Sequence, residues 1–199
     1  STLRECIEKA YAHFDHPEIA PLTSLSKFEK NMHMLELYHG PTLAFKDFAL
    51  QLFGHLLHEA LKGKKKKKAV VLGATSGDTG SAAIAGLVNT PEVEVFMLHP
   101  HGRVTDIQRR QMTTVDAPHI HNIAIEGTFD DCQALVKQLY LEADFLPRDK
   151  YFLISVNSIN WARIMVQIVY YLHAYLKLGA PEKGISFAVP TGNFGNIYA

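Results

Sequence analysis

The run GPTLAFKDF, at residues 40–48, places a single lysine, Lys46, between two phenylalanines. Apolar neighbours disfavour the charged form of an amine because they remove it from water. A neutral amine is the form that reacts with an aldehyde, so Lys46 is a candidate for Schiff-base chemistry with an aldehyde cofactor. The alternative is a lysine at a helix start whose stem lies on apolar neighbours while its ammonium group stays in water. The motif by itself favours the solvated lysine, so a Schiff-base role needs support from other parts of the chain.

Two polar, glycine-rich turns could bind anions near such a lysine. Residues 73–80 (GATSGDTG) and 191–196 (TGNFGN) each follow an expected strand and lead into an expected helix. Free N–H groups and the dipole at a helix N-terminus favour anions, and glycine lets the backbone approach closely. Neither turn has the Walker, dinucleotide-binding or GxSxG pattern. Each could merely connect a strand to a helix, but together with Lys46 they fit a site for a phosphorylated aldehyde and a second anion.

A polar cluster stands where an expected strand meets an expected helix. Its members are Asn157, Ser158, Asn160 and Arg163. Helix capping accounts for one or two of them. Arg163, one turn into the helix, is a candidate anion ligand.

Histidine pairs suggest a weaker hypothesis, a metal site. His55 and His58 are three residues apart in an expected helix, and His119 and His121 share one face of an expected strand. Neither motif supplies a third ligand, so packed or surface side chains explain them better. We predict no metal site.

Composition narrows the class of protein. The chain has 199 residues, 47% hydrophobic and 20% charged, as in a globular protein long enough to bury a core. Its formal net charge is zero, which gives no general attraction to nucleic acid or to acidic membranes. No run approaches the roughly 20 apolar residues of a membrane span. The two cysteines, Cys6 and Cys132, indicate a reducing compartment. We expect a cytoplasmic protein with no nucleic-acid or membrane partner.

Strand-like and helix-like segments alternate along the chain. The expected strands lie at 34–38, 69–72, 93–98, 120–125, 151–154 and 185–189. The expected helices lie at 1–14, 47–61, 81–88, 104–114, 128–141 and 159–176. This order predicts βαβ units and therefore an α/β fold of three layers, a mostly parallel twisted sheet flanked by helices.

Three local patterns refine this prediction. Thr128 and Asp131 have the spacing of a capping box, which explains Asp130 and Asp131 better than a pair of catalytic acids. Residues 62–68, six lysines and a glycine, are typical of a solvated loop rather than of a nucleic-acid site. The last long helix is expected to present one broad apolar face made of Trp161, Ile164, Ile168, Tyr171, Leu172, Tyr175 and Leu176.

Four motifs together resemble the threonine synthases. GPTLAFKDF, GATSGDTGSAA (73–83), SVNSINWARI (155–164) and PTGNFGN (190–196) occur in the order of that family, and the segments HGRVTDIQRRQM and IEGTFDDCQALVK are also similar to it. The resemblance covers residues 34–199. It implies a pyridoxal-phosphate enzyme with the tryptophan-synthase-β-like fold, PLP fold type II.

The resemblance implies roles for residues of this chain. Lys46 would form a Schiff base with pyridoxal 5'-phosphate and then move protons at Cα and Cβ of the substrate. The residues implied for the cofactor phosphate are Gly192, Asn193, Phe194, Gly195 and Asn196. Those implied for the substrate carboxylate and the cofactor ring are Thr75, Ser76, Asp78 and Thr79. Those implied for the substrate phosphate are Ser155, Asn160 and Arg163.

The implied reaction converts O-phospho-L-homoserine and water to L-threonine and phosphate, the last step of threonine biosynthesis. It proceeds by γ-elimination and water addition at Cβ, with the cofactor as electron sink. Two alternatives stay open: a serine or threonine dehydratase of the same fold, and a catalytically silent homologue that binds an amino-acid phosphate or a protein. The expected oligomeric state is a monomer or a homodimer.

Two features depart from the family pattern. Many relatives have asparagine at the position of Asp78, and an aspartate beside an anionic ring oxygen would be repulsive, so Asp78 is expected to cap a helix instead. The chain also starts at Ser1 without a methionine and stops at Ala199, before the hydroxyl residue that meets the pyridine nitrogen in the family. We therefore expect a fragment of a longer protein, inactive by itself.

The domain organisation follows from the same resemblance. Residues 1–68, with the lysine motif, would contribute to the large domain. Residues 69–157 would form a small Rossmann-like subdomain. Residues 158–199 would begin the half of the large domain that binds the cofactor phosphate.

Overall fold

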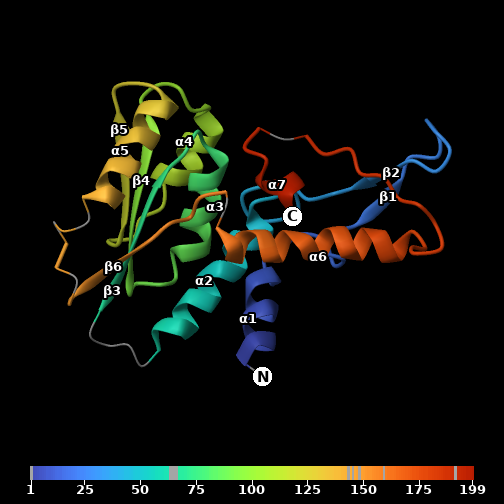
Figure 1. Cartoon of the computed structure of the whole chain (residues 1–199), viewed down its shortest axis with the longest axis horizontal. Helices are drawn as coiled ribbons and strands as arrows, with labels where there is room; N and C mark the ends of the chain where they lie inside the picture. Colours follow the sequence, from blue (N-terminus) through green and yellow to red (C-terminus); the bar gives the residue numbers. More distant parts are fainter. Residues whose placement is uncertain are drawn as a thin grey trace.

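A four-stranded parallel sheet forms the centre of the computed structural model, which describes residues 2–62, 67–142, 144, 146–147, 149–158, 160–190 and 192–199. Its strands stand in the order β5-β4-β3-β6 (Figure 1). Their bounds are β3 Lys68–Ala74, β4 Val93–Pro100, β5 Ile120–Ile125 and β6 Tyr151–Ile154. The predicted α/β class with a parallel sheet is confirmed.

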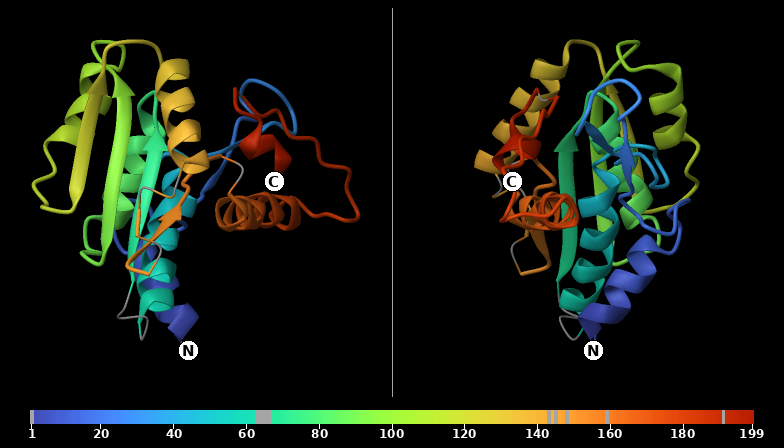
Figure 2. Two further views of the ribbon diagram at one scale, coloured as in Figure 1. Left: turned by 60° about the vertical axis from the view of Figure 1, so that its left-hand side comes forward. Right: turned by 90° about the vertical axis from the view of Figure 1, so that its right-hand side faces the viewer.

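Helices cover both faces of this sheet. On one face lie α3 (Asp78–Leu87), α4 (Asp106–Thr113) and part of α2 (Asp47–Leu61), packed on alternate residues of β3 and β4 such as Val71 and Val95. On the other face α5 (Phe129–Leu141) packs on Leu72 and Leu98. Figure 2 shows α4 and α5 on opposite sides of the strands. The two faces of β3 and β4 are both apolar because residues alternate across a strand and both sides are covered.

A second hydrophobic core lies between helices from the N-terminal and C-terminal parts of the chain. It contains α1 (Thr2–Tyr11), the first half of α2 and α6 (Trp161–Lys177). Phe48 of α2 lies against the rings of Phe14 and Tyr170, with centroids 5.3 and 5.4 Å apart. The helix α2 contributes to both cores and so fixes the lysine motif at its N-terminus relative to the sheet.

Helix starts follow the local sequence. Thr128 accepts a hydrogen bond from the Asp131 amide while Asp131 accepts one from Thr128, so the predicted capping box is confirmed and begins α5. An unpredicted capping box, formed by Thr105 and Gln108, begins α4. Each satisfies amide groups that have no partner within the helix.

Several element predictions were wrong. Residues 185–189 form no strand, and the expected strand at 34–38 is reduced to β2 (His33–Leu35), which pairs antiparallel with the unpredicted β1 (Leu22–Ser24). The helix expected from residue 81 begins at Asp78. In α6 the buried apolar positions are Ile164, Val166, Tyr170 and Ala174, whereas Trp161 and Leu172 of the predicted face are exposed. The prediction of a loop at 62–68 lies mostly outside the described residues, and Lys68 already belongs to β3.

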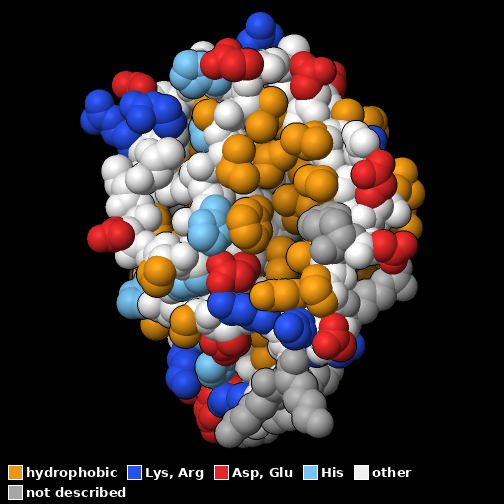
Figure 3. All heavy atoms as spheres, turned by 90° about the vertical axis from the view of Figure 1, so that its left-hand side faces the viewer, with side chains coloured by type: hydrophobic (Ala, Val, Ile, Leu, Met, Phe, Trp, Pro, Cys, Tyr) orange, Lys and Arg blue, Asp and Glu red, His pale blue; other side chains and the backbone are white. Residues whose placement is uncertain are grey.

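The helix α5 covers only part of its face of the sheet. Beside it runs an apolar groove of about 540 Å³ lined by Val70, Phe96, Ile123, Leu135 and Leu153. Figure 3 shows apolar side chains gathered on this side of the molecule with charged groups around them. Among the described residues, no helix is both long and apolar enough to cross a membrane.

Candidate active site

The topology of the sheet creates a crevice between β3 and β6. The chain passes from β3 to β4 and β5 in one direction, and β6 then pairs with the opposite side of β3. Ligands of open parallel sheets bind beyond the carboxyl ends of the strands at such a reversal. Residues 75–77, after β3, and residues 155–158, after β6, both lie at this edge. Two of the predicted motifs are therefore brought together by the strand order.

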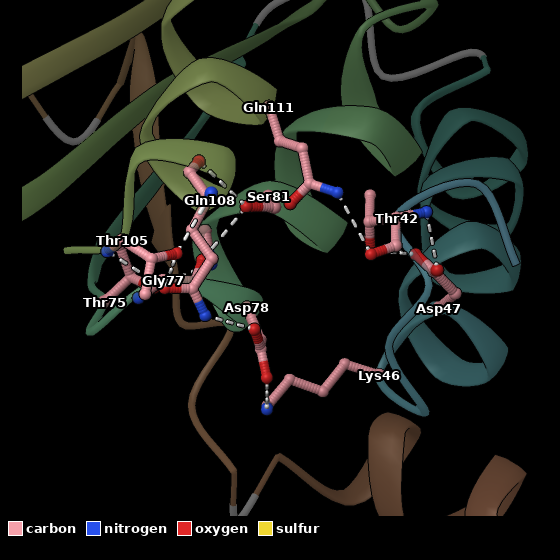
Figure 4. Close-up of polar contacts among 11 residues, drawn as sticks. Thr42, Lys46, Asp47, Thr75, Gly77, Asp78, Ser81, Thr105, Gln108 and Gln111 are labelled. Atoms are coloured by element: carbon pink, nitrogen blue, oxygen red, sulfur yellow. Dashed lines mark hydrogen bonds and ion pairs between the residues drawn. The ribbon is translucent and has the colours of Figure 1, made fainter. Parts of the chain in front are cut away.

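Lys46 lies directly before α2 and extends its amine toward this crevice. The Lys46 Nζ atom is 3.2 Å from Oδ2 of Asp78 and 4.8 Å from the ring centre of Phe45 (Figure 4). Phe48 packs in the core instead, so of the two flanking phenylalanines it is Phe45 that lies beside the amine. The amine has an aromatic ring on one side and a carboxylate on the other.

Asp47 holds the turn that presents the lysine. Its carboxylate is fully buried and accepts hydrogen bonds from the amide and the hydroxyl of Thr42, both at 2.8 Å. Burial raises the pKa of Asp47, although these hydrogen bonds oppose the shift. Gly40 is required here because a Cβ atom at that position would lie 2.4 Å from Cβ of Asp47. The turn is thus fixed by a buried acid rather than by the lysine.

The glycine-rich turn after β3 is organised by Thr75. This side chain is 1% exposed, and its hydroxyl oxygen accepts hydrogen bonds from the amides of Gly77 and Gly80 at 2.9 and 2.8 Å. Thr75 therefore shapes the turn, whereas Ser76 is exposed and Thr79 is half-buried.

Asp78 does not cap α3, contrary to the prediction. Gly77 occupies the N-cap position without a side-chain hydrogen bond, and the Asp78 carboxylate is shared between Lys46 and Gln108. Burial raises the pKa of Asp78, but the hydrogen bond from Gln108 and the charge of Lys46 outweigh it, so the pKa lies below its ordinary value. Asp78 is consequently an anion directed at Lys46.

A cavity of about 400 Å³ extends from Lys46. Its size is typical of small-molecule sites. The predicted site residues that line it are Lys46, Ser76, Arg163, Gly192, Asn193, Gly195 and Asn196. Phe45, Phe129, Ser158, Gln167 and Pro190 complete the lining.

Arg163 carries a buried positive charge into this cavity. It is 2% exposed, and its Nη1 donates to the carbonyl oxygen of Val156 at 2.7 Å, whereas Nε has no partner among the described residues. Burial lowers the pKa of Arg163 to about 10. One turn along α6, the Oε1 atom of the buried Gln167 also has no partner there. Buried polar groups without partners are uncommon, so this wall is suited to a polar, anionic ligand.

Ser155 and Asn160 have local contacts instead of lining the cavity. Asn160 caps α6 by accepting from the Ala162 amide at 2.9 Å, and its side-chain amide donates to the carbonyl oxygen of Ser155 at 2.6 Å. The Ser155 hydroxyl accepts from the Asn157 amide at 3.2 Å. Ser158, from the same polar cluster, does reach the cavity.

The loop at 192–196 leads into the short helix α7 (Gly195–Tyr198). Phe194 adopts the left-handed conformation with φ 56° and is 67% exposed, so its side chain does not line the cavity. Asn196 is buried, and Tyr170 and Tyr171 of α6 both donate hydrogen bonds to it. A Cβ atom at Gly195 would be 3.0 Å from the carbonyl oxygen of Ser158. Thr191 lies outside the described residues.

Sequence reasoning missed Gln108, Gln111 and Gln167. A signal existed for Gln108, since Thr105 and Gln108 have capping-box spacing. Gln167 follows Arg163 by one helical turn, which places the two side chains on one face. The two histidine pairs behave as surface or packed groups: His58 contacts Glu92, His121 contacts Glu94 at 2.8 Å, and His119 reaches the Leu87 carbonyl.

The donors of the cavity fit a phosphorylated aldehyde. Lys46 offers an amine, Arg163 offers a buried cation, and the side chains of Ser158, Asn193 and Asn196 offer neutral polar groups. No group of three or more histidine, cysteine or acidic residues is arranged for a metal ion within the described part of the chain. These residues can hold pyridoxal phosphate and a second anion.

Comparison with known proteins identifies the class. Residues 15–199 match the family of pyridoxal-phosphate dependent enzymes. The chain belongs to this family, whose cofactor is pyridoxal phosphate.

Individual relatives narrow the similarity to threonine synthases. The threonine synthase of Pseudomonas aeruginosa is 56% identical over 196 residues, which cover 98% of this chain and 40% of the relative. That of Schizosaccharomyces pombe is 49% identical and covers 99% of this chain and 39% of its own length. The crystal structure of PLP-bound threonine synthase from Brucella melitensis matches with a TM-score of 0.87 and 46% identity over 99% of this chain and 41% of that one. The resemblance to threonine synthases and the predicted fold type are confirmed, and the chain spans about 40% of the length of these relatives.

Proposed function

We propose that the full protein is a threonine synthase, which converts O-phospho-L-homoserine and water to L-threonine and phosphate. The observation that carries the proposal is the cavity beside Lys46, whose walls include both a reactive amine and a buried cation. A phosphorylated amino acid has the matching groups, an α-amino carbon at one end and a phosphate at the other. The similarity to threonine synthases supports this choice of substrate.

Lys46 is the catalytic residue of this proposal. Its amine removes a proton from Cα of the substrate and later moves protons at Cβ, which is general acid-base work contributing on the order of 10²- to 10⁴-fold. Pyridoxal phosphate, when bound, supplies the electron sink that makes these protons acidic. The Lys46 amine donates a hydrogen bond to Asp78, 3.2 Å away, which holds it in place beside the cavity.

Two anion-binding regions divide the remaining work. The cofactor phosphate would be held by Gly192, Asn193, Gly195 and Asn196. Phe194 would contribute through its left-handed backbone conformation, which shapes that loop. Arg163 would bind the substrate phosphate and stabilise it as it leaves from Cγ, because a guanidinium group offers paired donors to phosphate oxygens.

The other predicted residues act around these groups. The substrate carboxylate would be contacted by Ser76 and Thr79. Both belong to the turn that the hydrogen bonds of Thr75 stabilise. Ser155 and Asn160 would position Arg163 by fixing the start of α6.

The setting of the protein belongs to the same proposal. We place it in the cytoplasm as a monomer or homodimer. We also propose that residues 1–68 and 158–199 contribute to a large domain and that residues 69–157 form a small one. The two cysteines, Cys6 and Cys132, are buried and free, as suits a reducing compartment.

The test uses the full protein supplied with pyridoxal phosphate. Borohydride reduction followed by peptide mass spectrometry should place a phosphopyridoxyl group on Lys46, and Lys46→Ala should abolish it. Incubation with O-phospho-L-homoserine should release phosphate and form threonine in equal amounts. Keto-acid formation from serine or threonine, without phosphate release from the phosphorylated substrate, would favour a dehydratase. An unmodified Lys46 in folded protein would favour the silent homologue.

A further inference from the structure

The helix α4 sends two side chains to opposite sides of the Lys46 site. Gln108 and Gln111 are three residues apart and therefore lie on one face of the helix. The Gln108 Nε2 atom donates to Oδ1 of Asp78 at 2.5 Å, and the Gln111 Nε2 atom donates to the carbonyl oxygen of Thr42 at 3.1 Å. Figure 4 shows both amides reaching from α4 toward the residues around the lysine.

The orientation of the Gln108 amide is fixed by the capping box of α4. Its Oε1 atom accepts from the backbone N–H of Thr105 at 3.3 Å and from the Thr105 hydroxyl at 2.9 Å. A backbone N–H can only donate, so the oxygen must face Thr105 and the NH₂ group must face Asp78. An ionised carboxylate can only accept, which makes the contact with Asp78 complementary.

The turn after β3 leaves room for this contact. A Cβ atom at Gly77 would lie 2.3 Å from Cδ of Gln108, and Gly77 has a φ of 142°, which side chains rarely adopt. The Ser81 hydroxyl also faces the carbonyl oxygen of Gln108 at 3.4 Å. The α3 turn is therefore shaped to receive α4 at this point.

The second contact reaches the turn that carries the lysine. Thr42, whose carbonyl oxygen accepts from Gln111, also donates two hydrogen bonds to the buried Asp47, next to Lys46. Hydrogen bonds thus join Lys46 to Asp78, Asp78 to Gln108 and Gln111 to Thr42. The backbones of α4 and of residues 42–46 complete the connection between them.

We propose that Gln108 and Gln111 are positioning residues for Lys46. Gln108 holds the Asp78 carboxylate against the lysine amine, and Gln111 holds the turn from which the lysine extends. The proposal deepens the proposed function, since it concerns the residue to which catalysis is assigned.

The test measures the amine itself, without cofactor or substrate, in the full protein. Acylation of Lys46 by acetic anhydride at a fixed pH near 8, read by peptide mass spectrometry, reports how freely the amine can react. Asp78→Asn removes the carboxylate that holds the amine and should raise the rate roughly three- to tenfold, because the amine loses its charged hydrogen-bond partner. Gln108→Leu should raise it about two- to threefold, and Gln138→Leu, on the exposed side of α5, should leave it unchanged.

A double-mutant cycle separates positioning from a general loss of stability. If Gln108 acts through Asp78, Gln108→Leu should add nothing further in an Asp78→Asn background. An equal increase in both backgrounds would mean that the helix cap alone matters and would overturn the role of Gln108, as would no increase in the single variant. Gln108→Asn, too short to reach Asp78, repeats the test if the leucine variant does not fold.

Gln111 is tested by hydrogen exchange. Gln111→Leu should speed exchange of amides in residues 40–47 at least threefold, relative to Gln138→Leu, because the turn loses its attachment to α4. Unchanged exchange in that segment would overturn the role of Gln111. Both results are independent of which substrate the enzyme uses, so failure of this proposal is distinguishable from failure of the proposed function.

Discussion

Arg163 combines almost complete burial with a positive charge that no described carboxylate neutralises. Burying an unpaired charge is costly, and proteins keep such groups where a ligand completes them. Its hydrogen bond to the Val156 carbonyl fixes one end of the guanidinium group, Nε has no partner among the described residues, and the side chain lines the cavity. These features support the proposal that Arg163 binds the phosphate of the substrate.

Replacing Arg163 by leucine should therefore weaken binding of the phosphorylated substrate. We expect a loss of about 10- to 100-fold for O-phospho-L-homoserine, because a hydrogen bond to a charged group contributes roughly 1.5–3 kcal/mol. Affinity for L-homoserine, which lacks the phosphate, should change little, and Arg163→Lys should recover part of the loss. Titration of the cofactor absorbance measures all three. A fall in cofactor affinity alone would contradict the assignment to substrate.

At the scale of elements, α2 and α3 pack with their backbones in contact. A Cβ atom at Gly54 would lie 1.8 Å from the carbonyl oxygen of Gly86, and one at Gly86 would lie 2.3 Å from that of Leu50. This close approach sets the distance between the helix that carries Lys46 and the helix that carries Asp78.

Gly54→Ala should destabilise the protein by about 2–3 kcal/mol or more, because the added methyl group can only be accommodated by moving a backbone. Urea unfolding gives the change in free energy. Gly184→Ala, where the new methyl group meets nothing within 4 Å, is the matched control. Equal free energies of unfolding for the two variants would mean that α2 and α3 can move apart without destabilising the protein.

A cluster around His39 links the hairpin of β1 and β2 to the end of α1. His39 contacts Asp15 at 2.6 Å and Glu36 at 2.9 Å, while Thr23 donates to Glu36. Hydrogen bonds, first from Thr23, then from His39 and Tyr38, lower the pKa of Glu36 from 4.5 to about 2. The hydrogen bond to Glu36 raises the pKa of His39 above its ordinary 6.5.

Stability should consequently decline above neutral pH. The contribution of His39 is complete below pH 6.5 and is lost as the pH rises through its raised pKa. That of Glu36 is present above pH 4.5 and is lost only as the pH falls toward 2. Thermal unfolding from pH 5 to 9 should show a decline that His39→Gln flattens and His33→Gln, on the exposed strand β2, preserves. The same slope in all three proteins would argue against the cluster.

At the scale of the whole molecule, apolar surface remains on the outer side of α6. Val169 is 63% exposed and Leu172 52% exposed, and they continue a stripe with Trp161, Met165 and Leu176. The groove beside α5 is a second such surface (Figure 3). Exposed apolar patches of this kind favour association.

The 199-residue chain by itself should self-associate through the α6 stripe. Sedimentation velocity at increasing concentration should show a shift to larger species, and the double change Val169→Lys and Leu172→Lys should reduce it. Leu141→Lys, at an exposed leucine outside both surfaces, is the control. Unchanged association in the double variant would place the contact elsewhere.

The class of fold and the motifs of the site could both be predicted from the order of the residues. Alternation of apolar strands and helices is a local property, so β3 to β6 and α2 to α6 could be located from periodicity and from caps such as Thr128. Lys46, Arg163 and the glycine turns carried enough chemistry in their residue types to suggest a phosphate and an aldehyde.

Which groups meet in the site could be seen only in the folded chain. Strand order brings the ends of β3 and β6 together, and no local pattern specifies that order. The partner of Lys46 proved to be Asp78, 32 residues away, and the partner of Asp78 proved to be Gln108. The segment 185–189, apolar enough for a strand, forms none. Strand pairing and charge contacts depend on neighbours distant in sequence, which is why they became visible only in the folded chain.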